Sequence, residues 1–589
     1  MEAGTSESER PGPAATAALG VLVLLVALTP WPFGSAHPSS TRVVSVVALL
    51  VALGVVLRGR DGSVEVPSFP AGWVGGLLAL AVLQLVPLPP GLHALLAPGS
   101  VALWHPGEPA AAGVLGSGLR PISIDPDSTR RWLSLAVGLV ALAALAAPAL
   151  RHRRPARAAA LVIGGAGLAV ALYGLVARTF FGNRLYGVIP VPTIAPFGPF
   201  VSKNHFAGYV EMAALLTLGL AVGLADETRR SRGLLGWIDS SRAGRVVLAY
   251  GAAAVMVLAI LISLSRGGAV SLGAGALVFL LLRITASARR PSGLRVLLAL
   301  SLAAACGGLA FAALPSEGRE RVLSLVGATS DSSGRFRLGV WRDTLSLGAS
   351  SPLAGQGFGA FADALAPFKR GAGDMRVEHA ENDYLELFAE GGALGFLLVM
   401  GTVWGAARQA LRGLALEGDR LRRALGMGAA AAAAALLVHS GFDFNLRITS
   451  NAVLFAALAA WILAAAPSGD RPPGELAPRG AQALALGLAG ALAVALLTPL
   501  PVSVRALDAV REARASPTPL RLAQAEATLG AHLRGRPGDA EAWLLLGWVR
   551  AARGDRASGV ALGRHATRLD PQRPSIAAGA EALSAFARR

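Results

Sequence analysis

Apolar runs of about 16–22 residues recur along most of this 589-residue chain, and they constrain its fold more than any other feature. A helix of that length crosses the hydrocarbon core of a bilayer, which is about 30 Å thick. Only 15% of the residues are charged, whereas about a quarter are charged in an average soluble domain. The sequence therefore predicts an all-α, polytopic transmembrane helical bundle.

The apolar runs predict twelve or thirteen membrane-spanning helices. They lie near residues 15–30, 43–57, 71–87, 132–149, 159–177, 204–224, 246–264, 267–282, 296–314, 391–407, 425–441, 451–466 and 481–500. The first run lacks a convincing cleavage site, so we interpret it as a retained signal anchor.

Arginine placement predicts the orientation of these helices. The short loops after the even-numbered spans are rich in arginine, and such loops stay in the cytoplasm. The amino terminus is then cytoplasmic. The segments 88–131, 178–203 and 315–390 and the tail 501–589 emerge on the far side of the membrane, which is the periplasm of a Gram-negative cell. We therefore expect a multi-pass protein of the bacterial inner membrane.

The same pattern divides the chain into four parts. They are a cytoplasmic N-terminal tail (1–14), a transmembrane domain (15–466) with a long periplasmic loop (315–390), a cytoplasmic linker with the last helix (467–500), and a periplasmic helical domain (501–589).

The net charge of +18 indicates contact with anionic membrane lipids, because the arginines flank apolar runs. A nucleic-acid partner is not expected, since no basic stripe is interleaved with aromatic residues. The single cysteine, Cys306, permits no disulfide within the chain and no cysteine metal site.

The tail 501–589 has the helical spacing of a tetratricopeptide repeat in its stretch RPGDAEAWLLLGWVRAARGDRASGVALGRHATRLDPQRP. Trp543 and Gly547 fit the first helix, Gly554 and Asp555 the turn, and Leu569 the end of the second helix. Repeats of this type stack into solenoids with a concave binding face. The tail either binds a periplasmic protein partner or has only a packing role.

Polar residues beside an apolar run are costly and therefore informative. The first group is Lys203, Asn204 and His205, at the start of the span 204–224. Asn204 is a candidate helix cap, and a helix start with a lysine beside it suits an anion. The alternative is a cap with a lysine that reaches the lipid headgroups.

The second group is the turn SRGG, which joins two spans with almost no loop. Arg266 is forced to the far side of the membrane there, and its planar fork suits phosphate. Gly267 and Gly268 let the turn close tightly and let the backbone approach a ligand.

The third group lies in the long loop. Arg335, Arg337 and Arg342 surround Trp341, and a turn with Pro352 and three glycines follows. The arginines are candidates to hold a phosphorylated donor, and Trp341 is a candidate to lie at the membrane interface or under a sugar ring. The glycines do not form a Walker loop, because no Lys-Ser/Thr follows them.

The fourth group is EHAENDYLELFAEGGALG, which leads into the tenth span. A carboxylate or imidazole here would accept a proton from a hydroxyl. A metal site is poorly supported by one histidine, and a polar helix start is the plain alternative. A smaller group, HSGFDFNLRITSN, places Asp443 and Arg447 together, where structural pairing is expected.

At these residues the sequence resembles the O-antigen ligase and polymerase family of bacterial envelope glycosyltransferases. The resemblance rests on KNHFAGY, SRGG, the loop that ends in GQGFGAF, HAENDYLELFAEGGALG and DFNLRITSN. It implies transfer or polymerisation of a glycan from an undecaprenyl-pyrophosphate donor to a glycan, lipid or protein acceptor on the periplasmic face. It implies no nucleotide, metal or other cofactor.

Carried onto this chain, the resemblance makes Arg266 the candidate for pyrophosphate binding, with Arg335 and Arg342 as weaker matches. Ligases carry a histidine, then Asn, nine residues and Gly-x-x-Gly. Here Asn382 is followed after nine residues by Gly392 and Gly395, but Glu381 replaces the histidine.

Either Glu381 or His379 is then the base that acts on the acceptor. Asn382 and Tyr384, beside these two candidates, together with Lys203, Asn204, His205 and Trp341, complete the residues expected to bind the donor. The departure at Glu381 leaves ligase and polymerase both open.

Two other functions compete with this one. A transporter or flippase of lipid-linked glycans would explain the spans, but it predicts charges near the membrane midplane and broken helices. A membrane scaffold would use the tail to recruit partners and leave the long loop inert.

Overall fold

The computed structural model of the chain describes residues 11–59, 65–67, 70–191, 196–228, 241–287, 332–465, 474–475, 478–499, 510, 512–513 and 516–588. Nearly all regular structure in these ranges is helical. Two short antiparallel pairs complete it: β1 (Glu65–Val66) with β4 (Gly474–Glu475), and β2 (Arg184–Leu185) with β3 (Ile189–Pro190). The all-α prediction is therefore confirmed. The predicted span 296–314, with Cys306, lies outside the described residues.

Nine helices in the described ranges are long and apolar enough to cross a membrane. They are α2 (Pro38–Arg58), α7 (Pro126–Leu150), α8 (Arg153–Phe180), α9 (Lys203–Thr228), α11 (Ser241–Ser263), α12 (Arg266–Ser287), α17 (Asp383–Leu416), α18 (Arg420–His439) and α20 (Pro478–Leu497). Three shorter apolar helices are α1 (Pro13–Leu28), α3 (Ala71–Leu83) and α19 (Thr449–Ala464). Each predicted span that falls in the described residues coincides with one of these helices.

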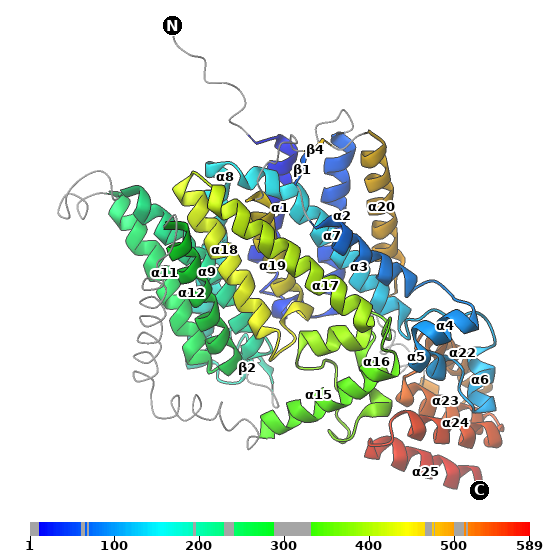
Figure 1. Cartoon of the computed structure of the whole chain (residues 1–589). Helices are drawn as coiled ribbons and strands as arrows, with labels where there is room; N and C mark the ends of the chain where they lie inside the picture. The colour runs from blue at the N-terminus through cyan, green and yellow to red at the C-terminus, as the bar shows by residue number, and fades with distance from the viewer. Residues whose placement is uncertain are drawn as a thin grey trace. The chain divides into compact units, whose positions relative to one another are not determined.

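The chain divides into two compact units (Figure 1). Unit 1 comprises Met1–Ala71, Ser134–Ala328 and Thr402–Leu496, and unit 2 comprises Gly72–Leu133, Thr329–Gly401 and Leu497–Arg589. The chain passes from one unit to the other within α7 and again within α17.

Small residues let the helices of unit 1 approach closely around α9. This helix is the most buried of the nine candidate spans, and it packs against α8, α11 and α18. A Cβ added at Gly219 would lie 2.5 Å from the carbonyl oxygen of Ala424 and 3.1 Å from Cα of Gly428. The alanine run of α18 serves the same close contact, because dispersion between tightly packed backbones associates helices in lipid.

Unit 2 holds a further set of helices, and its core joins segments far apart in the sequence. The helices are α4 (Pro90–Leu96), α5 (Pro98–Trp104), α6 (Pro109–Leu115), α15 (Ser332–Ser350), α16 (Phe361–Leu365), the 3-10 turn η3 (Ala366–Phe368), α22 (Pro519–Gly535), α23 (Ala540–Ala552), α24 (Arg556–Leu569) and α25 (Pro574–Arg588). Trp104, Phe361 and Trp543 are almost fully buried in one apolar cluster. The C-terminal helices thus share a core with the long loop.

Capping side chains explain where the C-terminal helices begin. The carboxylate of Asp539 accepts from the N–H of Ala542 at 3.1 Å, and that of Asp555 accepts from Ser558 at 3.1 Å. Such caps satisfy donors that the first helical turn leaves open. The helices α23 and α24 lie where the sequence predicts a hairpin, with Gly554 in the turn at φ 99°. The tetratricopeptide assignment itself stays a prediction.

The helix α17 is broken at Gly392, which has φ 62° and ψ −166°. The N–H groups of Ala393 and Leu394 donate to the carbonyls of Pro352 (2.8 Å) and Leu353 (3.1 Å). On the other side of the break, Ala389 and Glu390 are bonded in the same way. Their carbonyls accept from the N–H groups of Gln356 (3.1 Å) and Gly357 (3.0 Å).

The glycine-rich turn after α15 therefore completes the hydrogen bonding of a broken helix. Gly355 has φ 67°, and a Cβ there would lie 2.2 Å from the backbone of Glu390. The buried side chain of Gln84 fixes the same turn, because it donates to the carbonyls of Ala354 and Glu390 and accepts from the N–H of Phe358. The backbone N–H groups of Gln356 and Gly357 are engaged in this contact.

We predict that Gly392→Ala lowers the melting temperature of the purified protein in detergent. The backbone conformation of Gly392 is nearly restricted to glycine and costs other residues about 1–3 kcal/mol. A Cβ would also lie 2.3 Å from the carbonyl oxygen of Leu353. Gly54→Ala in α2 is the matched control, because nothing lies within 4 Å of its Cβ position. Equal melting temperatures for the two variants would show that the break is not constrained as described.

Candidate functional site

The predicted site residues fall into two groups, one in each unit. Unit 1 holds Lys203, Asn204, His205 and Arg266. Unit 2 holds the remaining predicted residues, which are Arg335, Trp341, Arg342, His379, Glu381, Asn382 and Tyr384.

In unit 1, the side chain of Asn204 joins the starts of α9 and α12. Its Nδ2 donates to Oδ2 of Asp443 at 2.5 Å, and its Oδ1 accepts from the hydroxyl of Ser265 at 2.8 Å. The expected cap role of Asn204 is wrong, because the hydroxyl of Ser202 accepts from the N–H of Asn204 at 3.2 Å and takes that place. The KNH and SRGG motifs, far apart in the sequence, are thereby brought together.

Asp443 is the buried anion at this junction. Besides Asn204, its carboxylate lies 3.3 Å from Nε2 of His205 and accepts from the N–H of Phe444 at 2.8 Å. The side chain is only 3% exposed, so its charge depends on these partners. The sequence pattern singled out Asp443 for structural pairing but gave no sign that it reaches Asn204 and His205.

The SRGG turn is shaped by its protein neighbours. The hydroxyl of Ser265 accepts from the N–H of Gly268 at 3.1 Å and caps α12, which begins at Arg266. A Cβ at Gly267 would lie 2.9 Å from Nε2 of His439, and one at Gly268 would lie 2.5 Å from Cβ of Ala207. The two glycines therefore let the side chains of His439 and Ala207 approach the turn closely.

Arg266 itself is half-buried in the first turn of α12. The positive end of a helix macrodipole lies at this turn and adds to the charge of the guanidinium. Lys203 is also half-buried, in the first turn of α9. Unit 1 thus places two cations at helix starts that the Asn204 network ties to each other.

A second buried pair in unit 1 escaped the sequence analysis. Nδ1 of His439 lies 3.1 Å and 3.2 Å from the two carboxylate oxygens of Glu211, and both side chains are fully buried. Glu211 was visible in the sequence as an acid inside an apolar run, but nothing in the sequence indicated that His439 faces it. His439 in turn lies against Gly267, beside Arg266.

In unit 2, His379 is held by a buried carboxylate. Nδ1 of His379 lies 2.9 Å from Oε1 of Glu386, and the other oxygen accepts from the N–H of Ala380 at 2.8 Å. The side chain of Glu386 is 1% exposed, whereas that of His379 is 31% exposed. Asn382 caps α17 by accepting from the N–H groups of Tyr384 and Leu385. This cap starts the helical turn that carries Glu386 to His379.

Glu381 has different partners from His379. Its Oε2 lies 3.3 Å from Nε of Arg337, and its backbone carbonyl accepts from the indole N–H of Trp341 at 3.3 Å. Its φ of 56° is unusual for a residue other than glycine. The two candidate bases therefore have separate partners: His379 contacts Glu386, and Glu381 contacts Arg337 and Trp341.

The three arginines of α15 differ in their surroundings. Arg337 reaches Glu381, whereas Arg335 and Arg342 are exposed. The sequence put all three arginines forward as candidates to hold a phosphorylated donor, and the family resemblance singled out Arg335 and Arg342. Trp341 and Tyr384 are half-buried. The helical period explains the difference, because Arg337 and Trp341 are four residues apart and share one face.

These observations define the class of the protein: an all-α, multi-pass membrane protein with buried polar pairs within and beside its apolar helices. A family model described as O-antigen ligase matches residues 251–400 of the chain. The matched stretch includes Arg266, the arginines of α15, the His379–Glu386 pair and the break in α17. The domain supports a role in glycan ligation or polymerisation. A search of the curated proteins gives no match.

We predict that Asp443→Ala destabilises the protein more than Asp443→Asn. Alanine removes the acceptor for Asn204 and Phe444, and each stranded buried donor costs roughly 1–3 kcal/mol. Asparagine keeps one carbonyl oxygen in place. Thermal unfolding in detergent, followed by the near-ultraviolet signal, measures the difference. A melting temperature for Asp443→Ala equal to that of wild type would exclude the described role of this carboxylate.

Proposed function

We propose that the chain is a membrane glycosyltransferase that transfers or polymerises a glycan from an undecaprenyl-pyrophosphate donor onto an acceptor hydroxyl. The observation that carries this proposal is the pairing of His379 with buried Glu386 inside the O-antigen ligase domain. A half-exposed imidazole oriented by a buried carboxylate is a common arrangement for a general base.

His379 acts on the acceptor in this proposal. With Nδ1–H donated to Glu386, Nε2 is the basic nitrogen, and it takes the proton of the acceptor hydroxyl. The hydroxyl oxygen bonds to the anomeric carbon, and the bond from that carbon to the pyrophosphate oxygen breaks. The pyrophosphate leaves with the electron pair. A positioned base contributes about 10²–10⁴-fold to such a step.

Arg266 binds the leaving pyrophosphate in the same proposal. Its guanidinium and the start of α12 both attract an anion. Lys203 adds a second cation in the same unit. Charge stabilisation in a site of low dielectric constant lowers the barrier, because negative charge grows on the leaving group in the transition state. Asn204 and His205 hold the motif that carries Lys203.

The remaining candidates bind the glycan. Arg335 and Arg342 are exposed cations on α15, and Trp341 and Tyr384 offer ring faces to a sugar. Glu381 holds Arg337 and Trp341 and is assigned a positioning role. The acceptor is a glycan, a lipid or a protein side chain, and no metal or other cofactor is needed for the displacement.

The proposed location is the bacterial inner membrane, with the amino terminus in the cytoplasm and the C-terminal helices in the periplasm. The arginine-rich loops after the even-numbered spans support this orientation. Transfer then takes place on the periplasmic side, where the long loop and the far-side segments emerge.

We predict that His379→Ala and Arg266→Ala each reduce glycan transfer at least about 100-fold, in line with the loss of a positioned base or of an electrostatic stabiliser. The measurement is the surface glycan of a deletion strain that carries each variant, with the lipid-linked precursor measured in parallel. We expect the precursor to accumulate. His105→Ala, an exposed histidine of unit 2, is the control at equal membrane level.

Glu381→Gln in the same strain identifies the base. We expect it to retain most of the transfer, because the amide still accepts a hydrogen bond from Arg337. Complete loss with Glu381→Gln and full transfer with His379→Ala would assign the base to Glu381. Full transfer with both variants and with Arg266→Ala would favour a transporter or a scaffold.

We predict that Glu386→Gln lowers kcat by about 10-fold or more and leaves the KM of the donor unchanged. The amide keeps a hydrogen bond to His379 but no longer stabilises the imidazolium that forms when His379 takes the proton. Steady-state kinetics with purified protein in vesicles separate the two constants. An increase in donor KM at constant kcat would place Glu386 in donor binding instead.

A further inference from the structure

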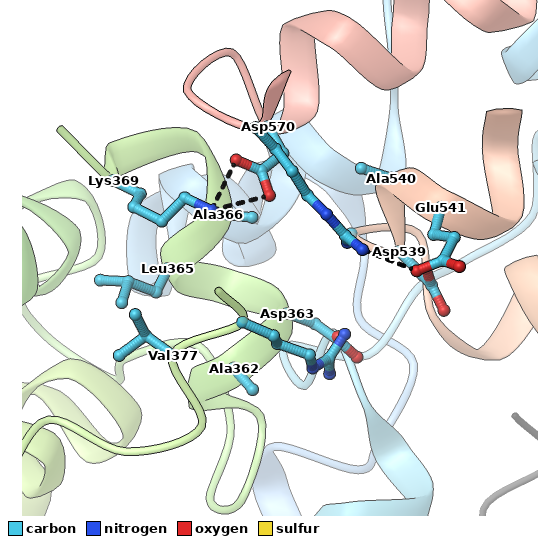
Figure 2. A pocket seen from close by; sticks show the side chains of 13 residues that line it. Ala362, Asp363, Leu365, Ala366, Lys369, Val377, Asp539, Ala540, Glu541 and Asp570 are labelled. Carbon is cyan, nitrogen blue, oxygen red and sulfur yellow. Dashed lines mark hydrogen bonds and ion pairs between the residues drawn. The ribbon is translucent and has the colours of Figure 1, made fainter. Parts of the chain in front are cut away.

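The chain that leads into His379 is held by the C-terminal helices. We call residues 361–377 the linking segment: it comprises α16, η3 and the coil that ends two residues before His379. Two turns of the C-terminal domain contact it, and residues of all three line one pocket (Figure 2). The first turn precedes α23, and the second joins α24 to α25.

A buried ion pair joins the linking segment to the second turn. Nζ of Lys369 lies 3.1 Å and 3.2 Å from the carboxylate oxygens of Asp570, and the side chains are only 4% and 8% exposed (Figure 2). Lys369 also donates to the carbonyl of Gly373 at 3.1 Å. It is one of two lysines in the sequence. Lysine is rarely buried without a specific partner.

The first turn holds the start and the end of the linking segment. A Cβ at Gly538 would lie 2.6 Å from the carbonyl oxygen of Asp363, so the two backbones touch. The side chain of Asp363 pairs with Arg376 at 2.6 Å. The charge of Asp363, with further help from Glu378 and Asp539, raises the pKa of Arg376 above its ordinary value.

The two turns are equivalent positions of the predicted repeat. Asp539 and Arg573 are 34 residues apart in the sequence, which is the tetratricopeptide period. The second turn makes one more contact with the linking segment, because the N–H of Ser575 donates to Asp374 at 2.8 Å. Successive helix pairs thus present the same edge to a single stretch of chain.

Apolar packing continues this contact up to His379. Val377 and Ala380, on either side of His379, are buried in the same core as Trp543 and Leu583 of the C-terminal helices. A further ion pair, Arg536 with Asp125 at 2.8 Å, ties the end of α22 to the segment before α7.

We propose that the C-terminal helices position His379 through the linking segment, with the Lys369–Asp570 pair as the main polar tie. This inference rests on the proposed function, because it assigns His379 to the reaction. In this proposal, the edge of the predicted repeat binds the linking segment of the same chain. Lys369 and Asp570 would act on His379 through the linking segment, so they are positioning residues.

Asp570→Asn and Lys369→Met test the proposal in the full-length protein in vesicles, with an undecaprenyl-pyrophosphate glycan as donor. Each leaves a buried charge of the pair without its counter-charge. We expect kcat to fall at least about ten-fold, with the KM of the donor unchanged. Glu581→Gln, an exposed acid on α25, is the matched control. Wild-type kcat for both variants would overturn the proposal.

A cross-link separates positioning from loss of folding. Lys369→Cys with Asp570→Cys, in a Cys306→Ser background, removes the ion pair and leaves two thiols that a short bismaleimide bridges. We expect low activity before cross-linking and a recovery of several-fold afterwards. Activity that stays low after complete cross-linking would contradict the positioning role.

The wild-type protein distinguishes the two levels of inference. If it transfers glycan and Asp570→Asn transfers equally well, only the positioning role is wrong. If the wild type transfers none, the proposed function fails, and the positioning role fails with it. Normal transfer by Asp570→Asn in vesicles, with a defect only in cells, would overturn intramolecular positioning and indicate a separate protein partner.

Discussion

The break in α17 constrains unit 2 more than any other single feature. A helix apolar enough to cross a membrane cannot leave backbone N–H and C=O groups unpaired, because the surrounding lipid offers them no partners. The turn at residues 352–357 supplies those partners, and Gln84 fixes the turn from a third segment. The break thereby fixes the register of the helix whose first turn carries Glu386 to His379.

Unit 1 follows the same rule with side chains. Its helices pack through glycine and alanine, which leaves little space for polar groups, and two buried carboxylates among them have defined partners. Glu211 bonds to His439, and Asp443 bonds to Asn204. A buried charge is tolerated where its partners are fixed. The half-buried cations Lys203 and Arg266 lie at the edges of this paired network.

The sequence predicted the helices well because their length and hydropathy depend on local composition. It also placed Lys203, Arg266 and His379 near helix starts, since polar residues there stand out against apolar runs. It did not predict the pairs. The contact of Asn204 with Ser265, or of His439 with Glu211, depends on packing between helices far apart in the sequence. Glu386 lay inside the quoted motif, but its role depends on a cap at Asn382 that turns it back toward His379.

The contact between the linking segment and the C-terminal helices also bears on how such chains are recombined. The linking segment lies within the stretch that matches the ligase family, whereas the helices that hold it lie beyond that stretch. A chimera that exchanges the C-terminal helices alone would bring in a new partner for Lys369 and keep the old lysine. We therefore expect an active chimera to take Asp570 and Lys369 from the same parent protein.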